Sequence, residues 1–118
     1  MLITTKALPL QLSTGFWCEA IAYTSNGLST HWLGSALSST ARIAVRWLRW
    51  RAGHISDQLD PPAAHPVRCW LADQAEHERA LAVLVSGDLY TLTIPDGAVR
   101  YLLSARPAKH TPLPRRTW

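Results

Sequence analysis

The sequence contains no stretch of about 18 consecutive apolar residues, so no membrane-spanning helix is expected. The N-terminal segment MLITTKALPLQL does not begin with a charge followed by a long apolar run, as a signal peptide would. Two cysteines, Cys18 and Cys69, are too few for a disulfide framework or a four-ligand zinc site, and we expect two buried free thiols in a reducing compartment. These absences favour a cytoplasmic protein without a membrane partner.

Motifs for catalysis and cofactor binding are also missing. Most of the six glycines fall at expected turns or helix ends, which leaves no glycine-rich phosphate loop, and there is no G-x-S-x-G motif. His77-Glu78 lacks the second histidine that a zinc-protease helix carries four positions on, where this chain has Leu81. We therefore expect no catalytic residue, no metal ion and no cofactor.

Acidic residues are few, eight against twelve lysines and arginines, and their distribution matters more than the net charge of +4. Residues 42–51 carry four arginines and no acid, whereas residues 52–99 carry seven acids and two arginines. From residue 100 onward there are five basic side chains and no acidic one. Local basic segments favour anionic partners such as nucleic acid, and they say little about the fold.

The chain does have a clear pattern of strands. Residues 16–23 and 28–33 are largely apolar runs with aromatic residues, and Asn26-Gly27 lies between them. An Asn-Gly pair in this position predicts a hairpin with a two-residue turn, in which both turn residues adopt positive φ. The strand pattern breaks at residues 34–39. The expected cross-strand pairs are Tyr23 with Thr30, Ile21 with Trp32, and Ala20 with Leu33.

Residues 40–59 predict one amphipathic helix, capped by Ser38, Ser39 or Thr40. One face repeats apolar residues at helical spacing and should face the core. A neighbouring face carries three arginines, since steps of three and four return to the same side of a helix. A further stripe, which lies off the core face, carries two tryptophans. The core face consists of Ala41, Ala44, Val45, Leu48, Ala52, Ile55 and Leu59. The arginine row consists of Arg42, Arg46 and Arg49, and the tryptophan stripe consists of Ile43, Trp47, Trp50 and His54.

Asp60-Pro61-Pro62 should end this helix, because proline lacks the amide hydrogen and disfavours helical geometry in the residue before it. A second helix is expected from Pro66 to about Val85. Helical spacing places Gln74 and Glu78 on its inward face. We expect Glu78 to form a salt bridge with an arginine of the first helix, or to lie at the edge of this face, rather than to act as a general base.

A second hairpin is expected from residues 89–94 and 99–105, joined by a turn at Pro95-Asp96-Gly97. Residues 2–8 alternate loosely and would add one more strand. The element order predicts an α+β fold, in which an antiparallel sheet of four to five strands in ββ-αα-ββ order has two helices packed on one face. Residues 1–106 would form this single domain, and residues 107–118 a basic, proline-rich tail.

The main functional hypothesis is a small non-catalytic domain that binds nucleic acid. Arginines of the first helix would contact phosphates, its tryptophans would stack on bases, and the basic tail would add affinity. One alternative is a protein-binding accessory or inhibitor module of the kind that mobile elements encode, which would use the tryptophan stripe or the open sheet face to bind a partner or a second copy. A third is an enzyme that uses Glu78 or a histidine, which no group of residues in the sequence supports. In the purely structural alternative the arginines are a solvated face, which acids of the second helix could pair with, and the tryptophans are core or dimer contacts. The candidate residues are Arg42, Arg46, Trp47, Arg49, Trp50, Arg115 and Arg116.

Overall fold

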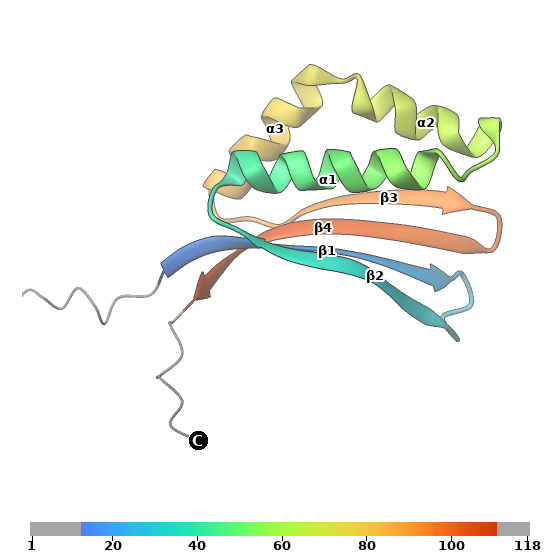
Figure 1. The fold of residues 1–118 in the computed structure, drawn as a ribbon, viewed down its shortest axis with the longest axis horizontal. Coiled ribbons are helices and arrows are strands. Elements are labelled where there is room, and N and C mark those ends of the chain that lie inside the picture. Colours follow the sequence, from blue (N-terminus) through green and yellow to red (C-terminus); the bar gives the residue numbers. More distant parts are fainter. Residues whose placement is uncertain (1–12, 111–118) are drawn as a thin grey trace, which may run out of the picture.

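The computed structural model describes residues 13–110, which fold into a sheet and three helices (Figure 1). In chain order the elements are β1 (Ser13–Thr24), β2 (Thr30–Ser38), α1 (Ala41–Ser56), α2 (Pro61–Leu71), α3 (Gln74–Val85), β3 (Tyr90–Asp96) and β4 (Val99–His110). The expected α+β class is confirmed, but the order is ββ-ααα-ββ, with three helices in place of two. The strand predicted at residues 2–8 lies outside the described residues.

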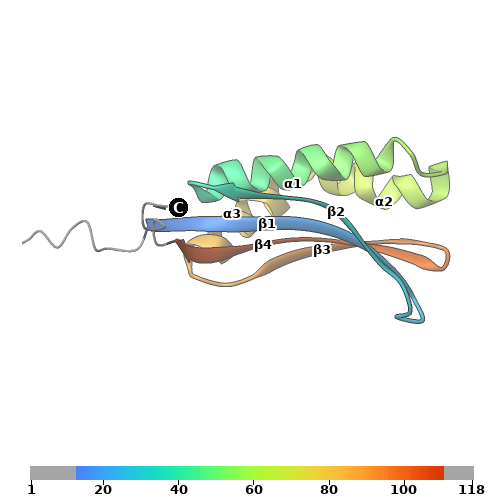
Figure 2. The ribbon, with the colours of Figure 1, turned by 60° about the horizontal axis from the view of Figure 1, so that its bottom comes forward.

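The strands form one antiparallel sheet in the order β2-β1-β4-β3. The two hairpins therefore lie side by side, and β1 pairs with β4 at the centre of the sheet. All three helices cover the same face, and no described element covers the other face (Figures 1 and 2). The core fills the space between these two layers, and the outer face of the sheet remains open.

The turn of the first hairpin is longer than predicted. The backbone amide of Thr24 donates to the carbonyl oxygen of Ser29 (3.0 Å), so the turn spans the residues between them. Gly27 has a φ of 77°, whereas Asn26 does not adopt a positive φ. Asn26 acts through its side chain instead, because its Oδ1 accepts hydrogen bonds from the hydroxyl of Thr24 and the amide of Leu28.

The register of this hairpin shifts near its middle. Two of the three predicted pairs are present, Tyr23–Thr30 and Ile21–Trp32. Ala20, however, lies opposite Gly34 and not Leu33, because β2 has an irregularity there that adds one residue to its side of the ladder. The predicted break at Gly34 is also wrong, since β2 continues through it to Ser38.

The predicted first helix is present as α1. The hydroxyl of Thr40 accepts a hydrogen bond from the amide of Ile43 at 3.1 Å, which satisfies one of the free donors at the helix start. The helix ends at Ser56, three residues before the predicted end. Its core face is buried as the spacing predicts, at Ala41, Ala44, Val45, Leu48, Ala52 and Ile55.

The predicted second helix is in fact two helices. α2 begins at Pro61, because proline is favourable in the first turn of a helix, where its missing amide hydrogen costs nothing. The chain then turns at Ala72, and Asp73 caps α3 by accepting a hydrogen bond from the amide of Glu76 at 3.1 Å. Pro66, predicted to start the second helix, lies inside α2.

This break changes which side of the last helix is buried. α3 buries His77, Ala80 and Leu84. An uninterrupted helix would have buried Gln74 and Glu78, and both of these are exposed. In the described part of the chain Glu78 forms no salt bridge. The salt bridge predicted for Glu78 is thus absent within residues 13–110, whereas its exposure agrees with the alternative of an edge position. The inward placement of Gln74 and Glu78 was wrong, because one helical phase was extended across the turn between two helices.

A chain of polar contacts connects α2, β3 and α3. The indole N–H of Trp70 donates to the hydroxyl of Tyr90 (2.9 Å), which donates to Oε2 of Glu76 (2.7 Å). Arg79 donates to the same carboxylate from Nε (3.0 Å) and Nη2 (2.7 Å). The hydrogen bonds from Arg79 and Tyr90 lower the pKa of Glu76 to about 2. Burial and the hydrogen bond to Glu76 raise the pKa of Tyr90 to about 12.

The second hairpin has the predicted pairing but a longer last strand. Gly97, with a φ of 61°, lies in the turn between β3 and β4. β4 continues beyond Ala105 to His110, which lies opposite Ser13 of β1. Residues 107–110 therefore belong to the sheet and not to the predicted tail. The remainder of that tail lies outside the described residues.

Candidate functional site

The three predicted arginines, Arg42, Arg46 and Arg49, are exposed along one side of α1. They line a groove of about 230 Å³ between α1 and α3. Within residues 13–110 the one salt bridge joins Arg79 to Glu76, so these three arginines have no salt-bridge partner there. Pairing of these arginines with acids of the neighbouring helix is therefore not seen, although Glu78 lines the same groove, and their exposure agrees equally with the alternative of a solvated face. The facing wall of the groove consists of Gln74, His77, Glu78 and Leu81.

The tryptophan stripe lies beside this arginine row. Trp50 is 51% exposed and Ile43 is 40% exposed, whereas Trp47 is partly buried against the core. With Arg46 these side chains line a shallow, largely apolar hollow of about 300 Å³. The structure thus brings the predicted arginines and tryptophans together on one surface of α1. The other two predicted residues, Arg115 and Arg116, lie outside the described residues.

Arg51 is a candidate that the sequence pattern missed. Its guanidinium carbon lies 5.5 Å from the ring centroid of Trp47 and 4.9 Å from that of Trp50, distances typical of cation–π contacts. Its Nε is buried and has no hydrogen-bond partner among the described residues. Arg51 follows Trp47 by four residues, a spacing that brings two side chains together on a helix, so the sequence contained a weak signal for the contact with Trp47. The burial of Nε could not be predicted from the sequence, because it depends on the position of β2 beside α1.

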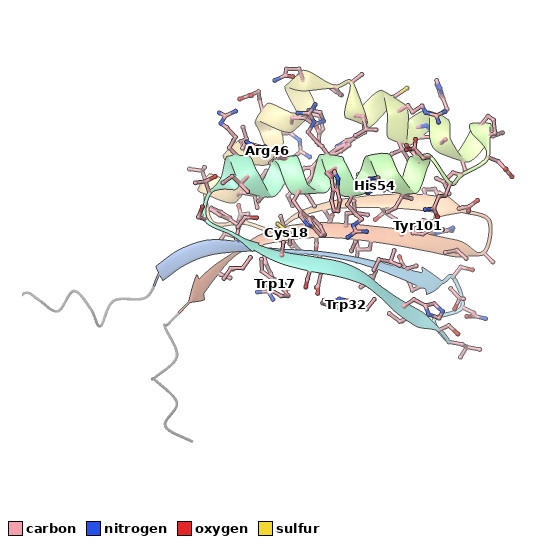
Figure 3. All side chains as sticks on the ribbon, viewed as in Figure 1. Trp17, Cys18, Trp32, Arg46, His54 and Tyr101 are labelled. Carbon is pink, nitrogen blue, oxygen red and sulfur yellow. The ribbon has the colours of Figure 1, made fainter. Side chains whose placement is uncertain are left out.

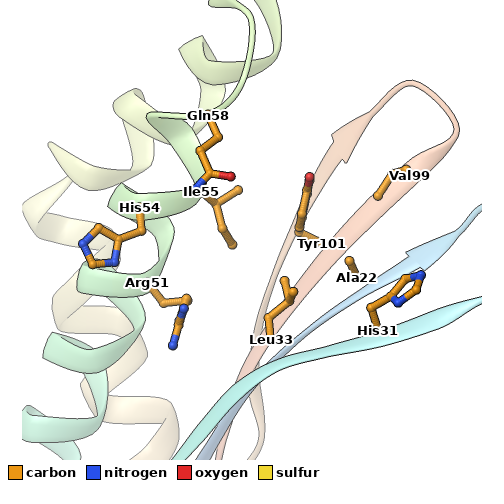
Figure 4. A pocket seen from close by; sticks show the side chains of 9 residues that line it. All are labelled: Ala22, His31, Leu33, Arg51, His54, Ile55, Gln58, Val99 and Tyr101. Atoms are coloured by element: carbon orange, nitrogen blue, oxygen red, sulfur yellow. The ribbon is translucent and has the colours of Figure 1, made fainter.

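A cavity of about 400 Å³ lies between the second half of α1 and the sheet (Figure 4). Ile55 and Gln58 project into it from the helix side, and Tyr101 faces them from β4. Arg51 points toward β2 at the lower end of the view. The cavity combines apolar walls with several hydrogen-bonding groups, as small-molecule sites commonly do.

The open face of the sheet carries a second group of exposed apolar side chains. Trp17 and Trp32 point away from the helices (Figure 3). Trp32 is 59% exposed and Leu37 is 49% exposed. Leu37 lies opposite Trp17 on the neighbouring strand, and Trp32 lies opposite Ile21, so two apolar cross-strand pairs lie on this face, with the pair Glu19–Ser35 between them. We call these four residues the outer-face patch.

The two cysteines occupy different environments. Cys18 is buried, as predicted, and burial raises the pKa of its thiol, which makes it a poor nucleophile. Cys69 is exposed on α2, contrary to the prediction of a buried thiol, because the turn of helix that carries it faces solvent. Its Sγ lies 3.5 Å from Nε2 of His65, one helical turn away. In the part of the chain that the structure describes, no three His, Cys, Asp or Glu side chains gather as a metal site would require.

No known protein family matches this sequence. Neither the curated proteins nor the solved structures that were compared with the chain give a match. No helix within residues 13–110 is long and apolar enough to cross a membrane.

Proposed function

We propose that the protein binds single-stranded nucleic acid through the outward surface of α1. The observation that supports this proposal best is the row of three exposed arginines without a salt-bridge partner in the described residues, beside a half-exposed tryptophan. Arginine contacts with phosphates supply most of the sequence-independent affinity for nucleic acid, and aromatic side chains supply stacking surfaces for bases.

The dimensions of α1 suit this role. Arg42 and Arg49 are seven residues apart, which corresponds to roughly 10 Å along a helix, enough to contact two neighbouring phosphates. Trp50 stands next to Arg46, so a base that stacks on the indole would keep its phosphate within reach of the guanidinium. We include the predicted residues Arg115 and Arg116 in the proposal as further phosphate contacts, on the basis of their charge.

Replacement of Arg46 by alanine tests this proposal. We expect a severalfold loss of affinity for a fluorescein-labelled single-stranded oligonucleotide at low salt, measured by fluorescence anisotropy. The slope of log K against log salt concentration should become shallower by about 0.7, the value for one lost phosphate contact on a single strand. Arg68→Ala is the matched control, because it removes an equally exposed arginine from α2, away from the proposed surface. Equal effects of the two substitutions, or no binding by the unmodified chain at low salt, would contradict the proposal.

A second candidate function is self-association through the outer-face patch. Exposed apolar side chains grouped on one face in this way commonly mark protein interfaces. β2, at the edge of the sheet, carries no charged residue and no proline, and so lacks two common features that keep edge strands from pairing with other chains. A second copy of the chain is the partner we favour, because two identical sets of apolar side chains can cover one another while each Glu19, which lies between the two pairs, accepts the hydrogen bond from Trp17 of its own chain.

For this second candidate, sedimentation velocity provides the test. We expect the unmodified chain to sediment as a dimer at micromolar concentration and Trp32→Ser to sediment as a monomer, since the substitution removes the most exposed member of the patch. Leu28→Ser is the control, because Leu28 is 83% exposed but lies in the turn. A monomeric unmodified chain at all concentrations would rule this candidate out.

A further inference from the structure

The cavity between α1 and the sheet has a wall that an anionic ligand would complement. Nine described residues line it, and none of them carries a carboxylate. Its apolar wall consists of Ala22, Leu33, Ile55 and Val99. Its polar wall consists of His31, Arg51, His54, Gln58 and Tyr101. Arg51 is the permanently charged group of this wall, so the cavity has a positive charge without a facing negative one.

The guanidinium of Arg51 is held in place from two sides. On the helix, the rings of Trp47 and Trp50 lie against it. On the sheet, Gly34 of β2 leaves the space that the guanidinium occupies. A Cβ atom on Gly34 would lie 2.6 Å from Nη2 of Arg51, and the φ of Gly34, +147°, is one that other residues rarely adopt. The position of this charge is therefore built into both layers of the fold.

The hydrogen-bonding capacity of Arg51 is not used within the described part of the chain. Its Nε is shielded from solvent and has no acceptor there. No described acid forms a salt bridge with Arg51, so an ionic partner would have to come from outside the described residues. A buried donor without an acceptor is unfavourable, and a guanidinium binds carboxylates and phosphates through two parallel hydrogen bonds. A ligand that brings such an anion would contact the terminal nitrogens of the guanidinium, because the shielded Nε leaves no room for an acceptor beside it.

We propose that this cavity binds a small molecule that has an apolar, ring-sized body and one anionic group, a carboxylate or a phosphate. The anionic group contacts Arg51, and the body packs between Leu33 and Ile55. Gln58 and Tyr101, which also line the cavity, offer further hydrogen bonds. A volume of about 400 Å³ is within the usual range for such ligands. This site does not include the arginine row proposed for nucleic acid and does not depend on that proposal, although Trp50 contacts Arg51 here and is the stacking surface there.

The test uses the full chain and three probes that share one ring: phenylacetate, phenyl phosphate and the neutral phenylacetamide. In calorimetric titrations we expect at least one of the two anions to bind about tenfold or more tightly than the amide, because the amide offers no charge to Arg51. The two anions distinguish a carboxylate site from a phosphate site. Shifts in the NMR spectrum should be largest at the side-chain Nε–H of Arg51 and at Leu33 and Tyr101.

Replacement of Arg51 by glutamine should remove the preference for the anion, whereas Arg68→Gln, which removes a charge from the exposed side of α2, should keep it. Circular dichroism establishes that both variants are folded. Should Arg51→Gln not fold, the comparison of acid with amide on the unmodified chain, with its NMR map, decides the matter. Equal binding of the acids and the amide, spectral changes centred elsewhere, or no saturable binding of any probe at millimolar concentration would overturn the proposal.

Discussion

Replacement of Leu48 by alanine should lower the free energy of unfolding by about 2–5 kcal/mol. Leu48 has no exposed surface and lies on the core face of α1, where the helix packs on the sheet. The substitution removes buried apolar area and leaves a cavity, and the cost depends on how far the surroundings relax. Because small domains are stable by only about 5–15 kcal/mol, this is a large share of the total.

Urea unfolding followed by circular dichroism measures this effect as a lower midpoint with an unchanged slope. Ile43→Ala on the same helix is the control, since Ile43 is 40% exposed and alanine is the better helix former. We expect that variant to remain within about 0.5 kcal/mol of the unmodified chain. A Leu48→Ala variant that loses less than the control would mean that α1 does not pack on the sheet as described.

Replacement of Glu76 by glutamine should lower the free energy of unfolding by about 1.5–3 kcal/mol at neutral pH, the range for hydrogen bonds to a charged group. The carboxylate accepts hydrogen bonds from Arg79 and Tyr90, and it lies in the first turn of α3, where a negative charge is favourable. Glutamine keeps the shape of the side chain but removes the charge, so the loss reports on the carboxylate itself.

The same substitution predicts a change in pH dependence. The folded-state pKa of Glu76 is depressed from about 4.5 to about 2, so the ionised carboxylate stabilises the fold above its ordinary pKa, and this contribution is lost as the pH falls through that interval. The difference in unfolding free energy between the unmodified chain and Glu76→Gln should therefore narrow between pH 4.5 and pH 2. Urea titrations at several pH values measure it, and a difference that stays constant with pH would contradict the assigned contacts.

The sequence predicted α1 well because its three faces follow from local periodicity alone. Leu48, Arg46 and Trp50 lie where helical spacing places them, in the core, on the basic row and on the exposed stripe. The geometry of the helix itself sets this phase, which does not depend on the element that packs against it. The adjacency of Arg46 and Trp50, which carries the proposed function, was accordingly available from the sequence.

The division between α2 and α3 was missed although a local signal existed. Asp73 followed three residues later by Glu76 resembles the capping pattern that starts many helices. Pro61 indicates where the first helix stops, whereas the capping pattern at Asp73 indicates where a further helix starts. With that start recognised, α3 would have had its correct phase, and Glu78 would have been placed on the surface.

The cavity around Arg51 had no comparable local signal. It depends on the shift in register that puts Gly34 opposite Ala20, and on the packing of α1 above that point. Both are relations between elements far apart along the chain. A glycine within a strand indicates a bulge or a close approach of other atoms, but the sequence does not say which group approaches.

The pairing of β1 with β4 has a consequence for the order of folding. Each hairpin joins strands that are neighbours in the sequence, whereas Ser13 lies opposite His110, with nearly the whole described chain between them. Contacts of such high sequence separation carry a large loop-closure entropy and slow the folding of small domains. During synthesis the pairing of β1 with β4 cannot form until β4 has left the ribosome. Until then the edge of β1 that will pair with β4 remains unpaired in the first hairpin. The step that completes the sheet is then also the step that ends the exposure of β1, and its rate sets how long the nascent chain is open to pairing with its neighbours.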